Sequence, residues 1–269
     1  MNVIRSEDRT LWPGNDIRSR QSFPATGSTR MTDYAFGLLL IHNDDLVEPG
    51  EGFDMHQHSD TEIVTWIVDG TLRHRDSSGS EMTLSAGQVE AITAGSGIRH
   101  AEVNAVGSTG RDVLRVIQMW LPTDAEGLQP AHSTADLNEA LDAGGLVTVV
   151  DGDGADGAAP LSIHTAGARL RAARLVAGKS VVTAPSAYQH IFVVKGEVDI
   201  DSESGSDVLQ EGDAARLSDD GAVRISGHGD GGDAEVLVWE MDRSVRTEPR
   251  WGQWRNRGVT VLTRPSAAG

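Results

Sequence analysis

The chain contains no cysteine. Disulfides are therefore excluded, and so are zinc ribbons, iron–sulfur clusters and thiol nucleophiles. Helical periodicity is scarce as well, and the best candidate is a helix over 134–143, where Leu137 and Leu141 stand four positions apart. The first twelve residues lack the apolar core of a secretory signal, and no run reaches the roughly 20 apolar residues of a membrane span. We therefore expect a soluble, cytoplasmic protein without a membrane partner.

Basic residues are also in short supply, with 23 Lys and Arg against 40 Asp and Glu and a formal net charge of −17. A net negative charge of this size opposes the electrostatic attraction to phosphate groups on which nucleic-acid binding depends. The basic tail, residues 244–269, is the exception and carries Trp251 and Trp254 among its arginines. We expect this tail to fold back over its own chain or over a neighbouring subunit, and we do not expect direct nucleic-acid binding. A monomer or a weak homo-oligomer is expected.

Turn residues are abundant. The chain has 31 Gly and 9 Pro, spread along its length between short apolar runs. This pattern is typical of an all-β protein. The runs 35–42, 62–68 and 113–121 are predicted to be core strands, and 62–68 is apolar on both faces. Asn43, Asp44 and Asp45 predict a turn after the first of them.

The second half of the chain repeats the first. The run IFVVKGEV at 191–198 echoes WIVDGTL at 66–72, and in each copy a second Gly follows the turn Gly after a similar interval (70 to 87, and 196 to 212). The second copy has no His-x-His pair. We therefore predict two tandem β-barrels with a metal site in the first alone. The predicted divisions are an N-terminal barrel at 1–130 (1–34 being an extended arm), a linker at 131–160, a degenerate C-terminal barrel at 161–243 and the basic tail.

Two short segments carry metal-type ligands, HQH at 56–58 and HAE at 100–102. Residues two positions apart share one face of a strand, so each segment presents two ligands together. Three imidazoles and a carboxylate without sulfur suit Fe(II), Mn, Ni, Co or Zn. Zinc with four protein ligands would form a closed structural site. An octahedral iron would keep two positions open for a bidentate substrate and dioxygen.

The blocks HQHSDTEIVTWIVDG and TAGSGIRHAEVN resemble the two motifs of the cupin superfamily, and more closely the signature stretches of the pirin family. The resemblance runs from about residue 22 to 240 and is densest over 50–104. It implies two tandem cupin barrels of double-stranded β-helix type, with metal only in the N-terminal one. The implied metal ligands are His56, His58, His100 and Glu102.

The sequence departs from the family pattern at two places. Gln57 stands where the family usually has Pro, and the arm lacks a His-Gly-Trp pattern that many members carry. Strand alternation turns Gln57 away from the barrel interior, so we expect the metal site to be retained.

Glu62 and Glu90 are candidate catalytic residues. Glu62 stands where the general cupin pattern has its carboxylate ligand, but the resemblance to pirins gives that role to Glu102 and leaves Glu62 to orient a histidine. Glu90 is either a general base in the barrel interior or an outward-facing, solvated side chain. Trp66 and Phe53 either line a substrate cavity or belong to the core. The histidines without a partner pattern are interpreted as structural or surface residues: His42, His74, His132, His164 and His228.

Two functions from different classes follow. The first is a metal-dependent dioxygenase, for which the resemblance implies quercetin 2,3-dioxygenase activity on flavonol-like or catechol-like small aromatic substrates. The second is a metal- and redox-dependent regulator that binds a partner protein without turnover. A purely structural metal is a third interpretation. One divalent ion per chain is expected, with Fe(II) favoured and Mn, Ni, Co, Cu and Zn as alternatives.

Overall fold

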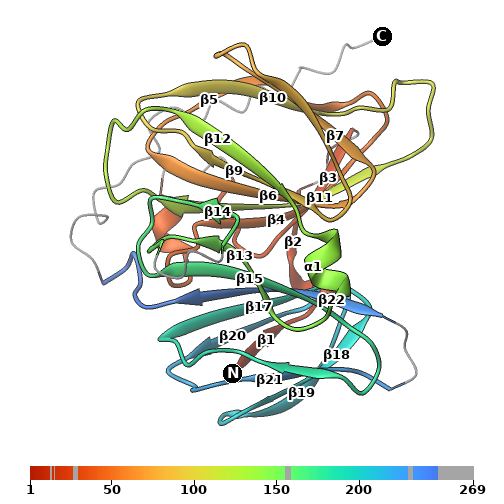
Figure 1. Ribbon diagram of the computed structural model, residues 1–269, viewed down its shortest axis with the longest axis vertical. Coiled ribbons are helices and arrows are strands. Elements are labelled where there is room, and N and C mark those ends of the chain that lie inside the picture. The colour runs from red at the N-terminus through yellow and green to blue at the C-terminus, as the bar shows by residue number, and fades with distance from the viewer. Residues whose placement is uncertain (13, 15, 27–29, 155–158, 230–232, 248–269) are drawn as a thin grey trace.

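Two β-barrels are stacked in the molecule (Figure 1). The computed structural model describes residues 1–12, 14, 16–26, 30–154, 159–229 and 233–247. Each barrel combines one seven-stranded and one four-stranded sheet. Among the described residues, α1 (Asn138–Asp142) is the single α-helix, accompanied by two 3-10 turns, η1 (Ser6–Asp8) and η2 (Met31–Asp33). The predicted all-β fold of two tandem barrels is confirmed.

The N-terminal barrel packs its two sheets face to face. The large sheet has the strand order β12-β9-β6-β11-β4-β3-β2, and the small one has the order β5-β10-β7-β8. Its strands are β2 (Thr10–Trp12), β3 (Ile17–Gln21), β4 (Ile41–Val47), β5 (Gly52–His58), β6 (Thr61–Asp69), β7 (Thr71–Asp76), β8 (Glu81–Ser85), β9 (Gln88–Thr93), β10 (Ile98–Asn104), β11 (Leu114–Pro122) and β12 (Ala131–Asp136).

The C-terminal barrel follows the same plan, with the sheet orders β1-β20-β17-β22-β15-β13-β14 and β16-β21-β18-β19. The first strand of the chain, β1, is thus an edge strand of the second barrel. The strands of this barrel are β1 (Asn2–Ile4), β13 (Val147–Asp151), β14 (Leu161–Ser162), β15 (Ala168–Leu175), β16 (Ser180–Val182), β17 (Tyr188–Lys195), β18 (Glu197–Ser202), β19 (Gly205–Gln210), β20 (Ala214–Ser218), β21 (Arg224–Gly227) and β22 (Ala234–Met241).

The internal repeat predicted from glycine spacing recurs in the backbone. Gly70 and Gly196 follow equivalent strands with φ of 82° and 74°, a conformation that glycine adopts without steric cost. The Gly87 N–H donates to the carbonyl of Ile67 at 3.0 Å, and the Gly212 N–H donates to the carbonyl of Val193 at 2.8 Å. The same hydrogen bond therefore closes the same turn in both barrels.

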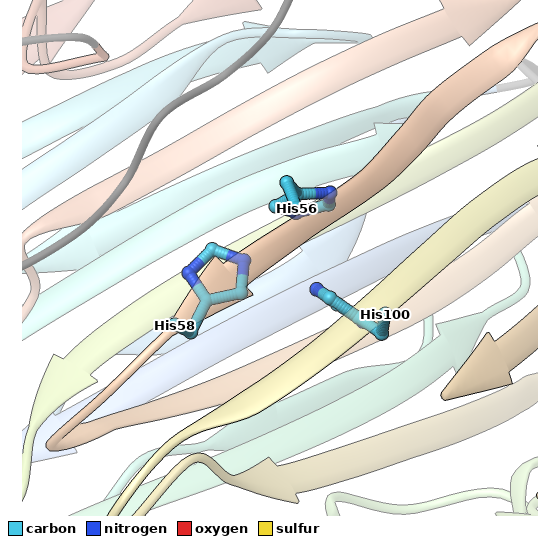
Figure 2. Close-up of side chains that lie close together, drawn as sticks. All are labelled: His56, His58 and His100. Carbon is cyan, nitrogen blue, oxygen red and sulfur yellow. The ribbon is translucent and has the colours of Figure 1, made fainter. Parts of the chain in front are cut away.

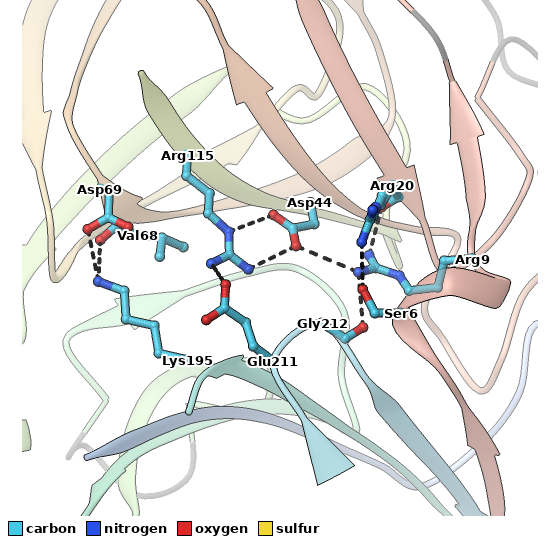
Figure 3. A network of polar contacts seen from close by, with 10 residues as sticks. All are labelled: Ser6, Arg9, Arg20, Asp44, Val68, Asp69, Arg115, Lys195, Glu211 and Gly212. Atoms are coloured by element: carbon cyan, nitrogen blue, oxygen red, sulfur yellow. Dashed lines mark hydrogen bonds and ion pairs between the residues drawn. The ribbon is translucent and has the colours of Figure 1, made fainter. Parts of the chain in front are cut away.

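The large sheets of the two barrels pack against each other and share one hydrophobic core. Trp66 donates its Nε1–H to Glu235 Oε1 at 3.0 Å across this interface, and Lys195 pairs with Asp69 at 2.9 Å. Figure 3 shows the neighbouring polar network, in which Arg115 bonds to Glu211 of the C-terminal barrel at 2.6 Å. Both faces of 62–68 are apolar because one face lines the interior of the N-terminal barrel and the other packs against the C-terminal barrel.

Two local predictions are wrong. The predicted turn at 43–45 lies inside β4, where Asp44 accepts hydrogen bonds of 2.9 and 3.0 Å from Arg115 that offset the cost of its burial. The predicted helix over 134–143 forms only from Asn138, because residues 134–136 pair with β9 as part of β12.

The structure also places the ends of the chain. The arm, predicted as extended, contains β1, β2 and β3. Arg246, at the start of the basic tail, donates to the backbone carbonyl of Thr32 at 3.4 Å, whereas Trp251 and Trp254 lie outside the described residues. No helix in the described ranges is long and apolar enough to cross a membrane.

Candidate metal centre

Three histidine side chains meet between β5 and β10. The antiparallel register sets His100 opposite His56 and Ile98 opposite His58, so the alternation of each strand directs all three imidazoles to one face. Their ring centroids lie 4.5 to 4.9 Å apart, and one ring nitrogen of each lies within 4.8 Å of the others. Figure 2 shows the three rings gathered between the two strands. Gln57 is exposed, as the alternation predicts.

The hydrogen bonds of these histidines suit metal coordination. His56 Nδ1 lies 2.7 Å from the carbonyl oxygen of Asp54, which can only accept, so Nδ1 carries the hydrogen and Nε2 keeps its lone pair. Burial, and then the neighbouring His56, lowers the pKa of His58 to about 3, and burial lowers the pKa of His100 well below its ordinary value. The imidazoles are therefore neutral, the form that binds metals.

Several of the ring nitrogens have no protein partner. His58 Nδ1 and both ring nitrogens of His100 are buried without a hydrogen bond among the described residues. A buried polar atom left without a partner costs about 1–3 kcal/mol, a cost that a metal–ligand bond removes. The residues present fit a divalent metal ion.

Glu102 borders the three histidines. Its carboxylate lies within 4.8 Å of ring nitrogens of His74 and His100. It does not form one cluster of that size with all three histidines of β5 and β10. Gln118 Nε2 donates to Oε2 at 2.8 Å, and Thr65 Oγ1 donates to Oε1 at 3.4 Å. Burial, and then the charge of Glu90, raises the pKa of Glu102 to about 7. The carboxylate is thus held by two donors beside His100.

A chain of acid–base side chains leads away from Glu102. Glu90 is fully buried inside the barrel, with Oε1 3.3 Å from His74 Nδ1. Asp76 Oδ2 lies 3.8 Å from His74 Nε2 and 3.3 Å from Nδ1 of His132, whose side chain is 23% exposed. Burial opposes charge on His74, but its contact with Glu90 and the nearby carboxylates raise its pKa overall. Glu90 therefore occupies the interior position that was one of its two predicted alternatives.

His74 and His132 were expected to be structural or surface residues, whereas the structure places them beside the site. Cross-strand pairing explains this position, because His74 on β7 stands directly opposite Glu102 on β10. The sequence offers no signal for that register, since β7 and β10 are separated by two further strands along the chain.

Glu62 lies on the face of β6 that points away from the barrel interior. Thr65 on β6 reaches Glu102 inside the barrel, so the even-numbered positions, among them Glu62 and Trp66, face outward. Glu62 Oε2 accepts a hydrogen bond from Thr93 Oγ1 at 2.8 Å, and burial raises its pKa. Glu62 and His56 are six positions apart, so strand alternation alone would place them on the same face. They lie on strands of two different sheets, joined by a turn, and the alternation therefore does not hold between them.

Aromatic side chains flank the three histidines. The ring of Phe53 lies 6.3 Å from that of His56, and the ring of Trp120 lies 4.8 Å from that of His58, centroid to centroid. Trp66, by contrast, belongs to the interface between the barrels. Of the two predicted cavity residues, Phe53 alone lies beside the site.

Comparisons with known proteins were made for the whole chain. The family model described as Pirin matches residues 8–121. A Mycobacterium tuberculosis protein, provisionally named a quercetin 2,3-dioxygenase, is 34% identical over 241 residues, which is 90% of this chain and 95% of that protein. The protein named quercetin 2,3-dioxygenase of Escherichia coli K12 is 34% identical over 207 residues, or 77% of this chain and 83% of the relative.

Solved structures agree with the predicted double cupin barrel. The crystal structure of the bacterial pirin YhhW from Escherichia coli, in complex with nickel(II), has a TM-score of 0.77 and 28% sequence identity, covering 90% of this chain and 99% of that one. A crystal structure named quercetin 2,3-dioxygenase, from Acinetobacter baumannii, has a TM-score of 0.69 at 19% identity, covering 90% of this chain and 86% of that one, and shows likeness of fold alone. The histidine cluster and the nickel-bound relative together support a divalent metal in this chain.

Proposed function

The chain belongs to the pirin family, and on that basis we propose that it is a metal-dependent dioxygenase of flavonols such as quercetin, or of catechol-like aromatic substrates. The observation that supports this most is the convergence of three neutral imidazoles from β5 and β10, of which those of His58 and His100 are buried and that of His56 is partly exposed. Relatives named quercetin 2,3-dioxygenase supply the substrate class.

The proposed ligands are His56, His58, His100 and Glu102. Three imidazoles and one carboxylate suit several divalent metals, and Fe(II) is favoured because octahedral iron would keep two positions open. Mn, Ni, Co, Cu and Zn are alternatives, and the Escherichia coli pirin was crystallised with nickel(II). When bound, the metal would supply Lewis-acid binding of the substrate oxygens and redox chemistry with dioxygen.

The protein side chains have separate roles in this proposal. Phe53 and Trp120 flank the histidines and offer apolar surface to an aromatic substrate. Glu90 is proposed to accept the proton of a substrate hydroxyl, because it is buried against His74 and within the same interior. Gln118 and Thr65 orient the Glu102 carboxylate. Glu62 has no part in the proposal, since it faces away from the histidines.

Oxygen uptake tests the function. Protein purified without oxygen and loaded with Fe(II) is expected to consume dioxygen when quercetin or a catechol is added. His58→Ala should lose both metal and turnover, whereas Gln57→Ala, which changes the exposed neighbour, should keep both.

Two results would contradict the dioxygenase. Full metal occupancy without oxygen uptake across a panel of flavonols and catechols would favour the redox-dependent regulator that binds a partner protein. A protein that holds only tetrahedral zinc would point to a structural metal.

A further inference from the structure

Two histidines lie buried between the barrels, away from the proposed metal centre. His42 comes from β4 and His190 from β17, both have no exposed surface, and their rings lie 4.7 Å apart, centroid to centroid. His42 Nδ1 lies 3.3 Å from Ser22 Oγ, but its Nε2 has no partner among the described residues. Neither ring nitrogen of His190 has one. An imidazole carries an N–H in either tautomer, so His190 has a buried donor without an acceptor whichever form is present.

Arginine side chains complete the surroundings of His190. Arg216 stands directly opposite His190 in the β17–β20 pair and donates to the carbonyl of Ser22 at 2.6 Å, but its buried Nε has no partner. No carboxylate of the described residues forms an ion pair with Arg216. Arg9 also has a buried Nε without a partner, although it lies 3.7 Å from Asp44. Burial lowers the pKa of both arginines to about 10.

This arrangement is unusual for a chain with a net charge of −17. Burial is the largest cause that lowers the pKa of His190, followed by His42, Arg216 and Arg9, and none of these three side chains is an acid. Aromatic rings form the rest of the wall, with Phe23 5.7 Å from His190 and Phe192 4.6 Å from His42. Arg216 is half-buried, with its Cζ 4.2 Å from the centroid of the Phe23 ring. Removing part of a guanidinium from water without a counter-charge is costly, and so is leaving a buried donor without an acceptor.

We propose that His42, His190 and Arg216 bind a small monovalent anion of halide size between the two barrels. An anion accepts hydrogen bonds from the His190 N–H and the Arg216 guanidinium and supplies the missing counter-charge. A metal cation is disfavoured there, because both arginines stay protonated at neutral pH. A buried water could accept the same hydrogen bonds but would bring no charge, and the two occupants differ in their dependence on chloride.

Thermal unfolding in different salts tests the proposal on the native protein. At constant ionic strength, replacing gluconate by 200 mM chloride is expected to raise the Tm by about 3 °C, because a ligand that binds only the folded state stabilises it. His190→Phe removes both nitrogens while keeping an aromatic ring, so it should fold and lose the chloride effect. Arg216→Gln should lose it as well.

Arg18→Gln is the matched control. Arg18 is exposed on β3 opposite Leu46, four positions along β4 from His42, so the substitution removes the same charge outside the proposed site and the chloride effect should persist. Crystals grown in bromide should show an anomalous peak within hydrogen-bond distance of His190 and Arg216. A wild-type Tm that is equal in chloride and gluconate, or a bromide-treated crystal without that peak, would overturn the proposal and leave water as the occupant.

Discussion

At the scale of single residues, the proposed metal centre depends on side chains that do not touch the metal. Trp120 Nε1 donates to Gln118 Oε1 at 3.0 Å, and Gln118 Nε2 donates to Glu102 Oε2 at 2.8 Å. The amide of Gln118 is thereby fixed with its donor toward the carboxylate. Such partners orient a ligand and tune its affinity for metal.

We predict that Gln118→Leu weakens metal binding roughly 10- to 100-fold, since it removes the donor to Glu102 at nearly constant volume. Competition with a chelator measures the affinity, and near-UV circular dichroism checks that the fold is kept. Gln210→Leu makes the same chemical change at an exposed position of β19 and should leave the affinity unchanged. Equal affinities for the wild type and Gln118→Leu would show that Gln118 does not position the ligand.

Asp45 provides a prediction about pH. Burial, as the largest cause, raises its pKa from 3.8 to about 7. A carboxyl with a higher pKa in the folded state stabilises the fold when protonated, and this contribution is lost as the pH rises through about 7. Asp45→Asn removes the ionisation, so at pH 8 it should raise the unfolding free energy of the metal-free protein by about 4 kcal/mol.

Urea unfolding at pH 8 and pH 5 measures this difference, which should shrink at the lower pH as the wild-type Asp45 takes up a proton. Asp8→Asn, at an exposed site, should change stability little at either pH. An Asp45→Asn protein less stable than the wild type at pH 8 would mean that the carboxylate is ionised and well paired.

At the scale of elements, two turn glycines of the C-terminal barrel have the same backbone conformation but different space around them. Gly196 has φ +74°, and an added Cβ would lie 2.8 Å from the Asp233 carbonyl oxygen and 2.9 Å from Ala234 Cα. Gly178 has nearly the same φ, +73°, with nothing within 4 Å of that position. The two positions differ in space and not in backbone conformation.

Gly178→Ala should therefore cost about 1 kcal/mol of unfolding free energy, which is the penalty of the left-handed conformation. Gly196→Ala should cost roughly 3 kcal/mol, because the backbone of 233–234 must also move. Chemical denaturation of the two variants measures the difference. Equal costs would show that the turn relaxes without strain.

Element β4 shows why local propensity is overruled. Asn43, Asp44 and Asp45 favour a turn in isolation, yet all three lie within a strand and are buried. Asp44 is compensated by Arg115, which is 71 positions away in the chain. Only the assembled sheets bring that partner close, so the sequence pattern alone predicts the wrong local structure.

At the scale of the whole molecule, the first residues stabilise the last barrel. Strand β1 pairs with β20, and Arg5 donates to Asp213 at 2.9 Å and to both carboxylate oxygens of Asp207 at 2.9 Å. We predict that Arg5→Gln loosens this edge at a cost of about 1 kcal/mol, in view of the partial exposure of the pair.

Hydrogen exchange locates the effect. Amide exchange should accelerate in 214–218 while 56–58 and 100–102 keep their protection. Arg30→Gln alters an exposed ion pair of the same arm, with Asp33, and should leave both regions unchanged. Faster exchange throughout both barrels would instead mean that β1 supports the whole molecule.

The sequence by itself determined the all-β class, the duplication and the clustering of His56, His58 and His100. These features depend on patterns with short periods: strand alternation, turn glycines, and ligands two positions apart. Tertiary structure alone decided that Glu62 faces away from the barrel interior, that His74 and Gln118 lie beside Glu102, and that His42 meets His190 between the barrels. Each of these positions depends on which strands pair, in which register, and on how two sheets pack. Those choices minimise the free energy of the whole chain, and no short segment of sequence encodes them.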